Sequence, residues 1–154
     1  MAARLDHLIL PVNDVFASVA FYEDVLGFRC EGDRPPFTVL RVADDLTLQL
    51  APWGTEGGVH LAFALPRAEF DAAFARVRAA GIPFGDSFHD VGNGRGPGDE
   101  DGARGPGKAI YLLDPSRHLR VRREQGMLAR HRLERIRQLP HRRKPRGRVL
   151  LERA

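Results

Sequence analysis

The sequence predicts an α+β fold made of two tandem βαβββ modules followed by a basic tail. The first 51 residues have the pattern of a strand, a helix and three strands, and the same order begins again after a glycine-rich linker. When His7 is aligned with His60, an offset of 53 residues, Gly27 and Gly81 fall within one residue of each other at the ends of the two predicted helices. A repeat of this kind indicates two copies of one supersecondary unit.

Length and composition set the domain organisation. A chain of 154 residues, 43% of them hydrophobic, can bury one sizeable core. We expect one domain over residues 4–124, with modules at about 4–52 and 58–124, and a tail over residues 125–154. The sequence does not open with a basic segment followed by a long apolar run. The single cysteine, Cys30, excludes an intrachain disulfide. Both features favour a cytoplasmic protein.

The first module begins with the mostly apolar run 5–12, which suits a buried strand. Asn13 or Asp14 then caps a helix whose apolar residues recur at helical spacing until Gly27, which is placed as a C′ stop. Three strands complete this module, at residues 28–31, 37–42 and 46–51.

The second module repeats this order. Residues 59–65 (VHLAFAL) predict a strand, and residues 66–80 predict a helix that Gly81 ends. The remaining strands are expected at residues 82–85, 108–113 and 118–122.

Residues 89–107 (HDVGNGRGPGDEDGARGPG) interrupt the second module. They are so polar and so rich in glycine that we expect a long loop, which is either an active-site lid or a disordered segment. Acidic residues in such loops are most often solvated turn formers, but five side chains here could supply a base or a further metal ligand: His89, Asp90, Asp99, Glu100 and Asp101.

Charge is segregated along the chain. The net charge is +4, but residues 125–154 carry ten Arg or Lys against two Glu, a local balance of +8 that leaves residues 1–124 at −4. The tail has the pattern of a short basic amphipathic helix ended by Pro140, followed by an extended or disordered segment. Such a tail could attract nucleic acid or an anionic membrane, and an accessory tail without either partner is the alternative.

Several segments together resemble one protein family. DHLILPVND, SVAFYEDVLGF, GGVHLAFAL and YLLDPSRHL follow the order and spacing of the vicinal-oxygen-chelate superfamily, which includes glyoxalases, bleomycin-resistance proteins and extradiol dioxygenases. The resemblance covers about residues 4–124, and the loop sequence is similar to a subgroup of small bacterial glyoxalase-like proteins, some associated with virulence or resistance. It implies a curved mixed sheet around a cleft, and a homodimer in which the modules of two chains complete each other's site.

The same resemblance places a metal site on His7, Gln49 and His60. Imidazole suits zinc, nickel or iron, and an amide oxygen suits harder divalent ions such as manganese. The carboxylate that the family uses as its fourth ligand would fall at Val121, which cannot bind a metal, and Glu124 would face the other side of a regular strand. The alternative is that the two histidines only form hydrogen bonds within the fold and that no metal is bound.

Three functions remain open at this point. The first is a glyoxalase- or dioxygenase-like metalloenzyme, a lyase, isomerase or dioxygenase, that uses the ion as a Lewis acid on a small oxygenated substrate. Val121 in place of the carboxylate argues against a standard lactoylglutathione lyase or extradiol dioxygenase. The second is a metal-free dimer of the bleomycin-resistance type that binds a drug or another small ligand, and the third is an interaction protein that acts through its tail.

Overall fold

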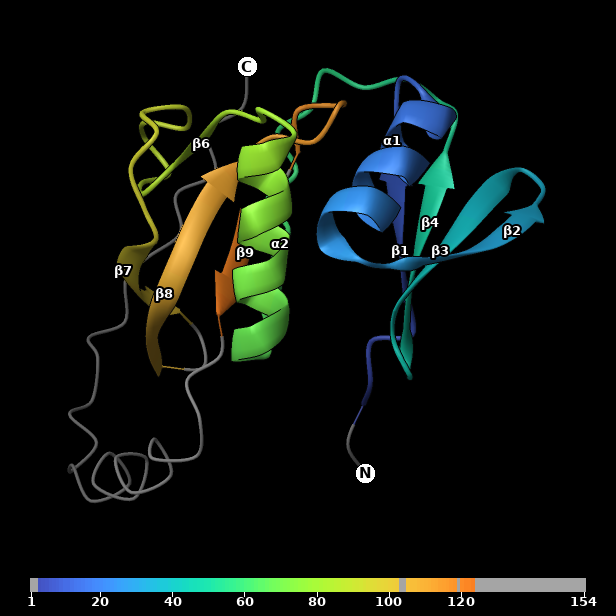
Figure 1. The fold of residues 1–154 in the computed structure, drawn as a ribbon. Coiled ribbons are helices and arrows are strands. Elements are labelled where there is room, and N and C mark those ends of the chain that lie inside the picture. The colour runs from blue at the N-terminus through green and yellow to red at the C-terminus, as the bar shows by residue number, and fades with distance from the viewer. Residues whose placement is uncertain (1–2, 103–104, 119, 124–154) are drawn as a thin grey trace, which may run out of the picture.

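The computed structural model describes residues 3–102, 105–118 and 120–123 (Figure 1). Glu124 and the basic tail predicted over residues 125–154, with its short helix, lie outside the described residues. The elements in chain order are β1 (His7–Pro11), α1 (Val15–Phe21), the π-helical turn η1 (Tyr22–Leu26), β2 (Arg29–Arg34), β3 (Phe37–Ala43), β4 (Leu46–Ala51), β5 (Ala62–Leu65), α2 (Arg67–Ala79), β6 (Phe84–Gly85), β7 (Gly98–Gly102), β8 (Gly105–Leu112) and β9 (Arg120–Arg123).

Each module forms its own mixed sheet, and the two sheets have the same strand order. Sheet A has the order β1-β4-β3-β2, and sheet B has the order β5-β9-β8-β6, with β7 paired to β8. In both sheets the first strand of the module is parallel to the last, and the other pairs are antiparallel. This common topology confirms the predicted duplication. The single curved sheet is confirmed only in part, because the two sheets share no paired strands among the described residues.

One hydrophobic core joins the two modules. The ring of Phe28, just before β2, stacks on Tyr22 at 6.0 Å between centroids and meets Phe63 of β5 edge-on at 4.9 Å. Figure 1 shows α1 against the strands of sheet A and α2 against those of sheet B, so each helix covers one face of its own sheet. No helix in the described part of the chain is long and apolar enough to cross a membrane.

Local hydrogen bonds explain where the first helix begins and ends. The Ala17 N–H donates to Oδ1 of Asp14 at 2.9 Å, so Asp14 is the N-cap. Asn13, the other predicted cap, instead bonds the backbone of Thr55 through its side chain. After η1 the chain turns at Gly27 with φ +79°, a conformation that glycine adopts without a steric penalty.

Two predicted elements differ in the structure. The strand predicted over residues 59–65 is shorter, because the Val59 N–H bonds the His118 imidazole and β5 begins only at Ala62. The prediction that residues 89–107 form only a loop is wrong, because part of the segment is β7, which forms an antiparallel hairpin with the start of β8. Glycine lowers strand propensity, but pairing with β8 outweighs that local preference.

Candidate functional site

His7 and Gln49 lie on the same face of sheet A. Leu10 of β1 and Leu48 of β4 belong to the core, and successive side chains of a strand point to opposite faces. The side chains of His7 and Gln49 therefore lie on the face away from the core, which we call the outer face of sheet A. Gln49 is in register with Ile9, the exposed neighbour of His7 on this face. The register thus brings two of the three predicted ligand positions onto adjacent strands.

A polar pocket of about 470 Å³ opens on the outer face of sheet A. Its lining includes Gln49 and Thr47 from β4, Asp6 from the segment before β1, and an ion-pair network around Glu31. Amide, hydroxyl and carboxylate groups at one opening suit a small polar ligand rather than an apolar one.

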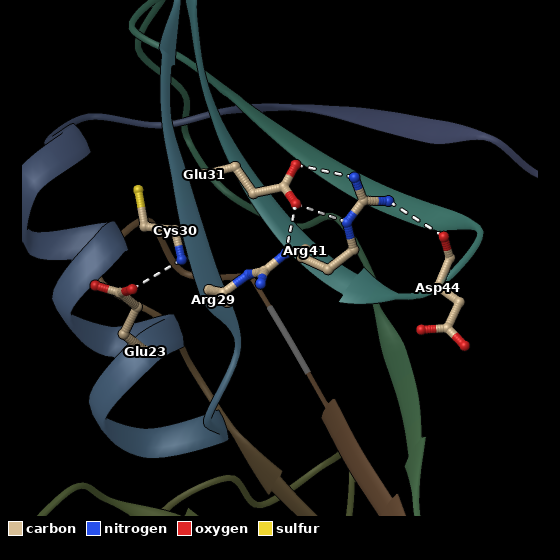
Figure 2. A network of polar contacts seen from close by, with 6 residues as sticks. All are labelled: Glu23, Arg29, Cys30, Glu31, Arg41 and Asp44. Atoms are coloured by element: carbon tan, nitrogen blue, oxygen red, sulfur yellow. Dashed lines mark hydrogen bonds and ion pairs between the residues drawn. The ribbon is translucent and has the colours of Figure 1, made fainter.

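The Glu31 carboxylate is held by two arginines (Figure 2). Arg41 donates to both of its oxygens, from Nε at 3.0 Å and from Nη2 at 2.9 Å, and Arg29 Nη2 donates at 3.0 Å. A β-bulge in β2 leaves Glu31 outside the regular register with β3. Bulges re-aim side chains, and here the bulge directs the carboxylate toward Arg41 and the pocket.

This network fixes the charge of Glu31. Hydrogen bonds from Arg41, and then from Arg29, lower the pKa of the Glu31 carboxyl from its ordinary 4.5 to about 2. The same pair raises the pKa of Arg41. Glu31 is therefore ionised above about pH 2, and both of its oxygens are already engaged, which makes it a poor proton acceptor for a bound molecule.

Asp6 orients the imidazole ring of His7. Nδ1 of His7 lies 2.8 Å from Oδ2 of Asp6, and the His7 side chain is 45% exposed. An ionised carboxylate can only accept, so in the neutral imidazole this contact places the proton on Nδ1 and the lone pair on Nε2. Carboxylate–histidine pairs of this kind orient metal-binding histidines in many proteins.

His118 fixes the segment that carries His60. The His118 imidazole is fully buried, with Nδ1 3.1 Å from the Val59 N–H and Nε2 3.1 Å from the Pro11 carbonyl. Because the Val59 N–H can only donate and the carbonyl can only accept, His118 is the neutral form protonated at Nε2. One ring therefore ties the end of β1 to the residue directly before His60.

Asp114 completes this link between the modules. Its carboxylate is buried and accepts from the Ser116 and His118 N–H groups at 2.9 and 2.7 Å and from the Tyr22 hydroxyl at 2.8 Å. Burial, and then the charge of Asp114, raise the pKa of Tyr22 well above its ordinary value. The DPSRH turn, noted in the sequence only as a family motif, thus connects η1 of the first module to β8 and β9 of the second.

The outer face of sheet B carries a second group of candidate residues. Ile110 and Leu112 belong to the core, so Tyr111 lies on the opposite, outer face, where its hydroxyl donates to Oε2 of Glu100 at 2.8 Å. The ring of Phe88, 60% exposed, lies 6.4 Å from Tyr111 and 5.8 Å from His60, measured between centroids. This chain of contacts connects His60 to a carboxylate on β7.

The loop that presents Phe88 is ordered by its own hydrogen bonds. Asn93 Nδ2 donates to Oδ1 of Asp86 at 2.7 Å, and Gly94 N–H donates to the Phe84 carbonyl at 2.9 Å. A Cβ atom on Gly85 would lie 2.2 Å from the Asp90 carbonyl oxygen, so the close approach of the loop requires glycine there. These contacts link Asn93 and Gly94 back to Asp86 and Phe84, and the role of residues 89–107 as a lid stays a prediction.

The register of β9 determines which of its positions belong to the outer face. Residue 121 pairs with Phe63 and Ile110, both in the core, whereas residue 120 pairs with Tyr111 on the outer face. Position 121 therefore lies on the core side of sheet B. Residues 120 and 122 are in register with Tyr111 and Ala109 of β8.

The three predicted metal ligands divide between the two sheets. His7 and Gln49 share the outer face of sheet A, and His60 lies beside Phe88 at sheet B. Among the described residues, no three His, Cys, Asp or Glu side chains come together as a metal site. The set His7, Gln49 and His60 stays a prediction.

Comparison with known families gives one match. A family model described as the Glyoxalase/Bleomycin resistance protein/Dioxygenase superfamily matches residues 4–105, well over half of the chain. The chain belongs to this superfamily. The resemblance identified in the sequence is confirmed, and the duplicated βαβββ topology agrees with it. No curated protein matches the sequence in a separate search.

Solved structures of the superfamily resemble this chain over most of its length. Oxidase ChaP-H2 is 26% identical with a TM-score of 0.67, and the match covers 81% of this chain and 96% of the other. A virulence protein from Salmonella typhimurium is 24% identical with a TM-score of 0.63, covering 81% and 99%. Fosfomycin resistance protein FosX from Mesorhizobium loti is 20% identical with a TM-score of 0.58, covering 86% and 99%. The last two likenesses show the fold alone.

Proposed function

We propose that this chain is a metal-dependent enzyme of the superfamily that acts on a small oxygenated substrate. The observation that carries the proposal is the pair His7 and Gln49 on one face, with His7 already oriented by Asp6 beside a polar pocket. When bound, a divalent ion would supply Lewis-acid polarisation of substrate oxygens. His7, Gln49 and His60 would hold it.

These residues fit a divalent ion in chemical type. His7 offers a lone pair on Nε2, and Gln49 offers an amide oxygen from the adjacent strand. Three protein ligands with an open position are usual for catalytic metals. All three are neutral, so the Glu31 and Asp6 carboxylates, which line the pocket, would compensate part of the metal charge without binding it.

We further propose that two copies of the chain complete the site. His7 lies on β1, and His60 lies just before β5; both strands are edge strands of their sheets. A second copy that brings its β5 edge to the β1 edge would put its His60 beside His7 and Gln49. In this arrangement the substrate would lie between the outer face of sheet A from one copy and that of sheet B from the other.

The test is metal binding by the purified full-length chain, measured by elemental analysis and by calorimetric titration with Zn²⁺, Ni²⁺ and Mn²⁺. We expect about one ion per chain in the parent and loss of that ion in both His7→Ala and His60→Ala. His89→Ala is the matched control, because His89 is also exposed and lies next to Phe88 but is not in the proposed ligand set.

A parent chain that binds none of these ions, with correct folding, would contradict the enzyme proposal. Val121, at the position where the family pattern has a carboxylate, favours a second candidate. The chain would then be a metal-free dimer that binds a drug or another small ligand in the same cleft. Binding of such a ligand without metal, and its loss in Gln49→Ala, would support that function.

A further inference from the structure

We propose that a groove beside α1 binds residues 127–140 of this chain, a segment that lies outside the described residues. The groove is lined by residues of α1, η1, β2 and β3. Cys30, one of these lining residues, is in register with the core residue Leu40, so the groove lies on the helix-covered side of sheet A. The polar pocket lies on the opposite side, and binding in the groove therefore requires no metal and no residue of the proposed metal site.

Apolar side chains form part of this groove, and one of them is an exposed aromatic ring. The groove has a volume of about 510 Å³, and Phe16 and Val19 of α1 line it together with Cys30. Phe16 is 89% exposed, more than any other large hydrophobic side chain in the described part of the chain. A hollow of about 240 Å³ adjoins the groove, because Val15 lines both, and it extends the apolar surface to Phe37. A partner that covered these side chains would remove apolar surface from water, which favours binding.

The groove also carries negative charge without a counter-charge. Glu23, Asp24 and Asp33 line it, and among the described residues no Lys or Arg lines either the groove or the adjoining hollow. Oε1 of Glu23 accepts from the Cys30 N–H at 2.8 Å (Figure 2), and Oδ1 of Asp33 accepts from the Thr38 hydroxyl. Within the same part of the chain, none of the three carboxylates forms an ion pair. An anionic groove with apolar walls fits a partner that is both basic and amphipathic.

Residues 127–140 have the complementary sequence pattern. They carry four arginines and one glutamate, a balance of +3, and Leu128, Ile136 and Leu139 fall near one face of the helix that the sequence predicts. Amphipathic helices bind apolar grooves through anchors at this spacing, and arginines beside the anchors can pair with carboxylates at the rim. Phosphates alone would attract the arginines but would offer nothing to the three apolar side chains. The groove offers partners for both kinds of side chain.

The thiol of Cys30 reports whether the groove is covered, because it is the only cysteine of the chain and lines the groove. Its alkylation by iodoacetamide in the full chain is followed by mass spectrometry. Burial of one isoleucine side chain changes an association constant by about tenfold or more, so Ile136→Asp should raise the alkylation rate about tenfold. Gln138→Asp is the matched control, because it adds the same charge on the other side of the predicted helix, and it should change the rate much less.

A fluorescent peptide of residues 127–140, titrated into the full chain, measures the contact directly. The chain carries Ile136→Asp, so that its own segment no longer competes with the peptide. We expect Phe16→Ser in this chain to weaken peptide binding about tenfold, because the exposed ring loses its contact with the peptide. Phe88→Ser is the matched control, since Phe88 is also exposed but does not line the groove, and it should leave the affinity unchanged.

Three outcomes would overturn the proposal. The first is an equal alkylation rate in the parent, Ile136→Asp and Gln138→Asp. The second is peptide binding that Phe16→Ser and Phe88→Ser affect alike, because the segment would then bind elsewhere on the chain. The third is a peptide that binds vesicles containing phosphatidylserine but not the chain. All measurements are made without added metal, so these outcomes leave the proposed function standing, and thermal unfolding checks that each variant is folded.

Discussion

Removal of one hydroxyl group by Tyr22→Phe is expected to weaken the link between the two modules. The hydroxyl donates to the Asp114 carboxylate at 2.8 Å, where Tyr22 is fully buried and Asp114 is 4% exposed. The variant keeps the aromatic ring and its stacking on Phe28, so the change isolates the hydrogen bond. Asp114 keeps its two backbone donors but loses the third.

Hydrogen bonds to charged groups typically contribute about 1.5–3 kcal/mol, and because two donors remain we expect a loss of about 2 kcal/mol in the free energy of unfolding. For a chain of this size each kcal/mol lowers Tm by about 2–4 °C, so the expected decrease is about 4–8 °C. Urea denaturation, monitored by circular dichroism, measures the free energy of unfolding, and differential scanning calorimetry measures Tm.

The pH dependence gives the same prediction an independent test. The folded-state pKa of Tyr22 is raised above its ordinary value, so its contribution to stability is present below about pH 10 and is lost as the pH rises further. Tyr22→Phe has no group to ionise there, so the stability difference between parent and variant should shrink above pH 10.

Tyr111→Phe is the matched control, because Tyr111 is the only other tyrosine and its hydroxyl bonds the partly buried Glu100. Because Glu100 is only partly buried, solvent weakens this bond, and we expect that variant to lose less stability than Tyr22→Phe. An unchanged Tm and an unchanged urea midpoint for Tyr22→Phe would refute the reasoning that this hydrogen bond stabilises the joined modules.

Three further predictions concern the electrostatics and the site. Arg41→Ala should raise the pKa of Glu31 from about 2 toward 4.5, which ¹³C NMR titration of the carboxyl measures. In the parent, the stability that comes from this lowered pKa is lost as the pH falls from about 4.5 toward 2. The variant should lose less stability over the same pH range. His118→Phe should lower the free energy of unfolding in urea by about 1–3 kcal/mol, because the Val59 N–H and the Pro11 carbonyl lose their hydrogen-bond partner on the ring, and an unchanged free energy would contradict this role. Asp6→Ala should weaken metal binding about 10–100-fold in calorimetric titration, because His7 loses the carboxylate that orients it. An unchanged metal affinity would show that Asp6 does not orient His7 for metal binding.

Most of the fold could be predicted from the sequence because its signals are local. Helical spacing of apolar residues located α1 and α2, and Gly27 marked the end of the first helix. β7 was missed because glycine and charged residues indicate a loop when they are judged locally, and only pairing with β8 makes them a strand. The early part of the strand predicted from residue 59 was also wrong, because the Val59 N–H bonds His118, a residue distant in sequence.

The site could be predicted only in part, for the same physical reason. The alternation of LTLQLA places Gln49 opposite the leucines, which is visible in the sequence. The pairing of Glu31 with Arg41 depends on a β-bulge and on strand register, and neither has a reliable local signal. His118 carries a weak signal in the DPSRH motif, since a histidine four residues after a turn-forming aspartate can bond the neighbouring backbone, but its two partners follow only from the fold.

Mixing two variants shows whether two copies of the chain share one metal site. His7→Ala and His60→Ala chains are each expected to bind no divalent ion alone. After unfolding and refolding together, a mixed dimer holds one intact site, formed by His7 of one chain and His60 of the other. We expect calorimetric titration with Zn²⁺ to find about one site per mixed dimer. If the parent binds one ion per chain but the two variants bind none after mixing, the site is not shared between two copies.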